Sequence, residues 1–133
     1  MRIRTVMAFI GGTLLVLSSA AHAFLGWPAV SAELKQVSAD HDLNMTVAIG
    51  WIFGSVAMLT YGLIVLRLAL RLLRGKQTDS GAVLIVGVSY AAFGLGAFLW
   101  TSFDPHFIGF VVIGLIVAVA ALWPVKAILS ESD

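Results

Sequence analysis

Apolar and polar residues follow one another along this chain in long blocks. Four blocks contain no Asp, Glu, Lys or Arg: residues 5–32, 43–66, 80–103 and 107–125. Each block is long enough for an α-helix to cross a hydrocarbon layer of roughly 30 Å, which takes about 17–25 residues. The pattern therefore predicts an all-α integral membrane protein, a four-helix transmembrane bundle in one domain over residues 1–133. The expected spans are 6–27, 44–68, 81–102 and 106–125.

The composition favours lipid as the solvent of these helices. Hydrophobic residues make up 60% of the chain and charged residues 11%, whereas an ordinary soluble domain has about 25% charged residues. A water-soluble core of this size could not cover four helices that are apolar on every side. The chain has no cysteine, which excludes disulfides, iron–sulfur clusters, thiol nucleophiles and thiolate zinc sites.

Positive charge gathers on one side of the predicted bundle. Of the Lys and Arg residues, only Lys35 falls on the other side. The positive-inside rule then predicts that both termini face the cytoplasm, with a basic cytoplasmic hairpin at about residues 67–80. Arg67, Arg71 and Arg74 recur there at helical spacing, so we interpret them as a basic anchor against lipid headgroups. We expect a multi-pass protein of a bacterial inner membrane, with the lipid bilayer as a partner and no nucleic acid.

The N-terminal segment has two interpretations. Its basic start, apolar run and Ala21-His22-Ala23 sequence are typical of a secretory signal peptide, whose cleavage would remove residues 1–23. The apolar stretch continues to Val30, however, which favours a retained first span. Beyond it, Pro28 and Ser31 predict a short helix that lies along the outer face between spans 1 and 2.

Small residues at helical spacing are candidates for helix packing, because helices in lipid associate through close backbone approach. Gly50 and Gly54 form a G-x-x-x-G pair in the second span, which favours packing within the bundle or a face for self-association. Small residues also line one face of spans 3 and 4, and we expect these faces to pack within the bundle. They are Gly87, Ala91 and Gly94 in span 3, and Gly114, Ala118 and Ala121 in span 4.

Histidine and aspartate residues collect at the predicted outer face. His22 lies near the end of the first span, Asp40 and His41 precede the second, and Asp104 and His106 precede the fourth. Imidazole and carboxylate groups together suit a divalent transition metal, so these five residues are candidate metal ligands. Haem held between His22 and His106 is a second possibility, because haem iron accepts axial histidine. Both aspartates also have a structural interpretation as helix N-caps.

No motif in the sequence identifies a catalytic site, and no Asp, Glu, Lys or Arg lies within a span except Arg67 at the very end of the second. We therefore favour a non-enzymatic protein, a subunit, assembly or interaction partner of a larger membrane protein or of a second copy. One alternative is a metal- or haem-binding protein acting at the extracytoplasmic face. Another is a small-molecule transporter or quinone-type binder. Such a protein needs a cavity open to one side. It would use four aromatic residues of the spans: Trp51, Phe53, Tyr90 and Phe93.

Overall fold

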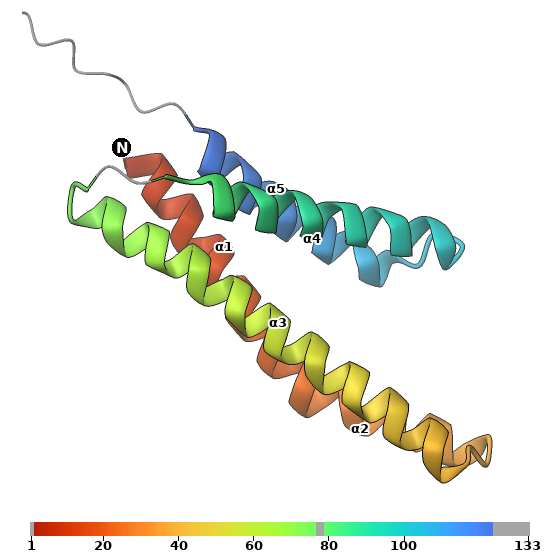
Figure 1. The fold of residues 1–133 in the computed structure, drawn as a ribbon. Helices are drawn as coiled ribbons and strands as arrows, with labels where there is room; N and C mark the ends of the chain where they lie inside the picture. The colour runs from red at the N-terminus through yellow and green to blue at the C-terminus, as the bar shows by residue number, and fades with distance from the viewer. Residues whose placement is uncertain (1, 77–78, 124–133) are drawn as a thin grey trace, which may run out of the picture.

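The computed structural model describes residues 2–76 and 79–123, and all regular structure in this part of the chain is helical (Figure 1). Four helical stretches are long and apolar enough to cross a membrane: Ile3–Gln36, His41–Leu73, Gly81–Trp100 and Pro105–Leu122. The prediction of an all-α chain is confirmed for the described residues, and the four apolar helices are consistent with a multi-pass membrane protein. In chain order the elements are α1 (Arg2–Ala21), the π-helix η1 (His22–Gly26), α2 (Trp27–Gln36), α3 (His41–Leu73), α4 (Gly81–Trp100), the 3₁₀ helix η2 (Pro105–Phe107) and α5 (Ile108–Leu122).

The segment between the first two spans differs from the prediction. Residues 27–36 are helical, but they continue α1 through η1 instead of forming a separate helix along the outer face. The reason lies at the proline. The Trp27 N–H bonds to the His22 carbonyl five residues back, and Pro28, which has no N–H, follows at the start of α2, where a proline is tolerated. The π-helix thus lets the helical stretch pass the proline.

The helices form two hairpins that diverge from one another (Figure 1). In the first hairpin, α1, η1 and α2 run beside α3. In the second, α4 runs beside α5. The hairpins touch mainly through α1 and α5 and less through α3 and α4. Figure 1 shows that the start of α1, the end of α3, the start of α4 and the end of α5 meet at one end, which we call the closed end. We call the region between the two hairpins toward the opposite, open end the wedge.

The hairpins also differ in length. Helix α3 has 33 residues, about 50 Å at a rise of 1.5 Å per residue, whereas the 20 residues of α4 span about 30 Å. Because a hydrocarbon layer is about 30 Å thick, the second hairpin matches it and the first extends beyond it.

Within each hairpin, glycines allow the backbones to approach closely. A Cβ added at Gly87 would lie 2.5 Å from the backbone nitrogen of Ala118, and one added at Gly114 would meet the backbone of Ala91. The predicted stripes of α4 and α5 are therefore confirmed as packing surfaces within the chain. Gly50 behaves differently, because nothing lies within 4 Å of a Cβ built there. Gly50 therefore packs against no other part of the chain that the structure describes.

The well-packed interior lies toward the closed end. The largest fully buried side chains are Leu15 of α1, Val65 of α3 and Val117 of α5. Toward the open end, the buried hydrophobic residues of α3 and α4 stop at Met58 and Tyr90. Since lipid is as apolar as these side chains, burial supplies little driving force, and close packing and hydrogen bonds must hold the helices together.

At the closed end, two hydrogen bonds join the last turn of α5 to other elements. Arg4 Nε donates to the Ala120 carbonyl at 3.0 Å, and Ser80 Oγ donates to the Ala121 carbonyl at 2.9 Å. The last four carbonyls of a helix lack partners within that helix, and a cation at this terminus is favoured by the helix dipole. These bonds therefore cap α5 while joining it to α1 and to the start of α4.

Candidate functional site

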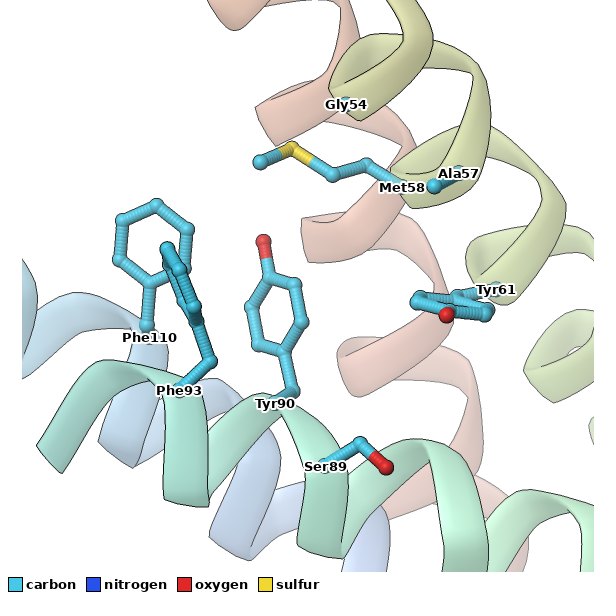
Figure 2. A pocket seen from close by; sticks show the side chains of 8 residues that line it. All are labelled: Gly54, Ala57, Met58, Tyr61, Ser89, Tyr90, Phe93 and Phe110. Atoms are coloured by element: carbon cyan, nitrogen blue, oxygen red, sulfur yellow. The ribbon is translucent and has the colours of Figure 1, made fainter. Parts of the chain in front are cut away.

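A cavity of about 300 Å³ lies between the hairpins where they begin to diverge (Figure 2). Four of its lining residues come from the first hairpin and four from the second: Gly54, Ala57, Met58 and Tyr61 of α3, Ser89, Tyr90 and Phe93 of α4, and Phe110 of α5. Its volume is at the lower end of the range for small-molecule sites, about 300–1,000 Å³.

Helical periodicity explains why these side chains share a surface. On α3, Gly54, Ala57, Met58 and Tyr61 follow the i, i+3, i+4, i+7 spacing, which places them on one face of the helix. On α4, residues 89 and 93 are one turn apart, and residue 90 lies beside them. The small residues at positions 54 and 57 leave the space that the larger side chains of the second hairpin surround. The α3 face was not singled out from the sequence, although its spacing is visible there.

Aromatic rings form the wall of the cavity on the second hairpin. The ring centroids of Tyr90 and Phe110 are 5.2 Å apart, and those of Phe93 and Phe110 are 5.4 Å apart in an edge-on arrangement. These distances fall in the preferred range for aromatic pairs, about 4.5–7 Å. Phe110 therefore holds the other two rings in place. The sequence analysis named Tyr90 and Phe93 as candidate ligand-binding residues, and the structure brings both to the cavity.

Three hydroxyl groups belong to this otherwise apolar surface. The Tyr90 hydroxyl points into the space between the hairpins (Figure 2) and is hydrogen-bonded to the side chain of Ser18 of α1. The hydroxyls of Tyr61 and Ser89 make no hydrogen bond to any residue that the structure describes. In lipid there is no water to satisfy them, so each is available to a polar group that enters the wedge.

His22 and Trp51 form a rigid platform beside the cavity. Their rings are stacked, with centroids 4.1 Å apart and planes 7° from parallel. Trp51 Nε1 donates to the His22 carbonyl at 2.7 Å, and the same carbonyl accepts the Trp27 N–H that closes the π-helix. Single π-helical turns are rare and occur frequently at functional sites. Here the π-helix sets the position of His22.

Gly54 connects this platform to the cavity. It lines the cavity, and a Cβ built on it would lie 3.4 Å from His22 Nε2. At that distance a methyl group would be in ordinary contact with the ring, so a small residue at position 54 leaves the imidazole in its place. The second glycine of the G-x-x-x-G pair therefore makes room for a histidine ring instead of a close helix crossing.

His106 lies on the other side of the wedge, on the second hairpin. Its ring centroid is 6.1 Å from that of Phe110, which lines the cavity. It is also near enough to His22 for charges on the two imidazoles to interact. The structure thus places one predicted histidine from each hairpin beside the wedge.

The remaining candidate ligands are engaged as helix caps or lie elsewhere. Asp40 Oδ1 accepts the Leu43 N–H at 2.7 Å at the start of α3, and Asp104 Oδ1 accepts the His106 N–H at 2.9 Å at the start of η2. The capping interpretation is thus confirmed for both. His41 is exposed at the beginning of α3.

No group of three or more His, Asp or Glu side chains that could hold a metal ion occurs among the described residues, which include all five candidates. The continuous first helix explains this. The ten residues of α2 carry the chain about 15 Å away between His22 and Asp40. A helix folded back along the outer face would have kept them together.

Two of the predicted aromatic residues lie outside the cavity. Trp51 stacks on His22, and Phe53 is 73% exposed on the outer side of α3. The basic residues Arg67, Arg71 and Arg74 are exposed near the end of α3, away from the wedge. Their contact with lipid headgroups stays a prediction.

Comparison with known proteins adds no family to this description. A scan against models of protein families finds no match, and neither a search of curated proteins nor a search of solved structures finds a similar chain. Functional inference therefore depends on the wedge and on the residues that surround it.

Proposed function

We propose that this protein is a non-enzymatic membrane protein that binds a small lipid-soluble molecule, such as a quinone-type compound, in the wedge between its hairpins. The observation that carries this proposal is the cavity of about 300 Å³, with an aromatic wall and two hydroxyl groups that have no partner among the described residues. The proposed location is a bacterial inner membrane with both termini in the cytoplasm, as the charge distribution predicts.

The side chains around the cavity suit the head of such a molecule. Phe93, Phe110 and Tyr90 offer ring faces and edges, which attract a flat conjugated ring. The hydroxyls of Tyr61 and Ser89 can donate hydrogen bonds to carbonyl oxygens of the ligand. The volume admits a ring-sized head, so a long apolar tail would remain among the lipid chains.

The arrangement of the hairpins provides a route into the cavity. The hairpins diverge beyond their contact at the closed end (Figure 1), and the cavity wall can be reached from outside the protein, since Phe93 is 57% exposed. A lipid-soluble ligand needs no aqueous path. The proposal includes retention of the first helix, because α1 supplies Ser18 beside Tyr90 and the main contact with α5.

A cavity-filling substitution tests this proposal. Ala57→Phe places a ring in the cavity, and Ala92→Phe is its matched control, because Ala92 is exposed on α4 and does not line the cavity. The purified protein in detergent is titrated with a short-tailed quinone, and quenching of tryptophan fluorescence reports binding. We expect Ala57→Phe to weaken binding at least about tenfold, the effect of losing roughly 1.4 kcal/mol. Equal binding by both variants, or none by the wild type, would exclude the wedge as a quinone site.

A second candidate function is association with another transmembrane helix through the outer face of α3. Ala48, Ile49, Ile52 and Phe53 line a shallow hollow there, and Gly50 is open on the same helix. A glycine with free space beside it permits close approach of a second backbone. Gly50→Leu would then disrupt a complex seen by cross-linking in native membranes, whereas Ala57→Phe would leave it intact. An unchanged cross-linking pattern in Gly50→Leu would count against this candidate.

A further inference from the structure

The closed end contains a buried cation that the wedge does not explain. Arg4 lies in the first turn of α1 and is only 5% exposed, which is unusual for an arginine. Its side chain is enclosed by protein, although exposed basic residues occur at the same end of the molecule.

The guanidinium group of Arg4 uses only part of its hydrogen-bonding capacity. It carries five N–H bonds, and the structure provides one acceptor, the Ala120 carbonyl that Nε meets at 3.0 Å. No carboxylate among the described residues pairs with it. Asp79, which precedes α4, instead accepts the N–H of Gly81 at 2.8 Å. Among the residues that the structure describes, the terminal nitrogens of Arg4 thus have no acceptor and its charge has no counter-charge, an unfavourable state for a buried cation.

The surroundings of Arg4 would attract an anion. Arg71, Arg74 and Lys76 are exposed at the end of α3, which lies beside the start of α1 (Figure 1). Such a cluster at a membrane surface draws anionic lipids toward it. Trp123, directly after α5, is 40% exposed, and tryptophan is typical of the level of the lipid headgroups.

We propose that the closed end binds the phosphate group of an anionic phospholipid, with Arg4 as its specific ligand. Arginine presents paired N–H groups in a planar fork that matches two oxygens of a phosphate. The exposed basic residues supply general attraction, and the buried fork supplies specificity. A bound lipid would neutralise Arg4 at the point where α1, α4 and α5 are joined, and would therefore stabilise the contact between the hairpins.

Native mass spectrometry of the detergent-purified protein tests the site, with phosphatidylglycerol and phosphatidylcholine added in equal amounts. We expect the wild type to retain phosphatidylglycerol, and Arg4→Gln to reduce that preference about tenfold, as expected for losing hydrogen bonds to a charged group. Arg67→Gln is the matched control, since it removes the same charge from an exposed position of α3. Arg67→Gln should keep most of the preference.

A second variant covers the case in which Arg4→Gln does not fold. Arg4→Lys keeps the charge but not the fork, and should retain phosphatidylglycerol more weakly than the wild type. Phosphatidylglycerol should also raise the melting temperature of the wild type more than inorganic phosphate at the same concentration. The proposal is overturned if Arg4→Lys and Arg67→Gln keep equal preference, or if inorganic phosphate stabilises the protein as well as the lipid does.

Discussion

Replacing Gly87 by alanine tests the close backbone contact between α4 and α5. The added Cβ would lie 2.5 Å from the backbone nitrogen of Ala118 and 2.9 Å from the Gly114 carbonyl oxygen. Both neighbours are backbone atoms, which cannot rotate away. To reach an ordinary contact of at least 3.4 Å from that nitrogen, α4 and α5 must separate locally by about 0.9 Å. A gap of about this size forfeits a quarter to a half of the dispersion energy of each contact it opens.

The expected cost of Gly87→Ala is about 1–3 kcal/mol of the free energy of unfolding, the usual range for an overpacked site. The matched control is Gly96→Ala on the same helix, because nothing lies within 4 Å of a Cβ built at Gly96. There the substitution should be neutral or stabilising by up to about 1 kcal/mol, since alanine favours a helix more than glycine does. Unfolding by SDS in mixed micelles, followed by circular dichroism, measures both. Equal stability of the two variants would refute the described seam between α4 and α5.

Two further substitutions test hydrogen bonds that join elements far apart in the chain. Ser80→Ala removes the bond to the Ala121 carbonyl and should lower the free energy of unfolding by about 1 kcal/mol in the same SDS assay. Thr60→Ala, which removes a hydroxyl bonded only within its own helix, should have a smaller effect, and the reverse order would contradict the capping of α5. Trp51→Phe keeps a ring beside His22 but removes the donor to the His22 carbonyl, with an expected cost of about 1 kcal/mol. Trp100→Phe, at a residue that is 91% exposed, should cost nothing measurable, and similar losses in both variants would show that the indole bond is unimportant.

The distribution of contacts suggests how the proposed functions relate to the architecture. The hydrogen bonds that cap α5 and join it to α1 and to the start of α4 lie at the closed end, where they come from Arg4 and Ser80. Farther along, the wall of the wedge consists of aromatic rings held by one another. The proposed lipid site would therefore stabilise the junction, while the proposed ligand site lies where the hairpins are free to separate.

Several properties of the candidate site could be read from the sequence, and others could not. Tyr90 and Phe93 were recognisable as polar and large aromatic residues within a span, and Asp104 as a cap because a proline follows it. The role of Gly54 was not recognisable, because a G-x-x-x-G pair looks the same whether it faces a helix backbone or an imidazole. Arg4 was counted only as one charge in an orientation rule, and its burial depends on α5, more than a hundred residues away in the chain.

The sequence by itself determined the solvent and the class of the fold. Every backbone N–H and C=O group must be hydrogen-bonded in lipid. Four long uncharged segments meet this requirement there as helices. The tertiary structure alone decided how those helices pair. It also decided that the helix continues past Pro28, that His22 and His106 each lie beside residues lining the cavity, and that Asp40 caps α3. The physical reason is that hydropathy is a property of each segment, whereas packing depends on backbone distances between segments. In lipid, a methyl group at Gly87 or Gly114 is enough to change those distances.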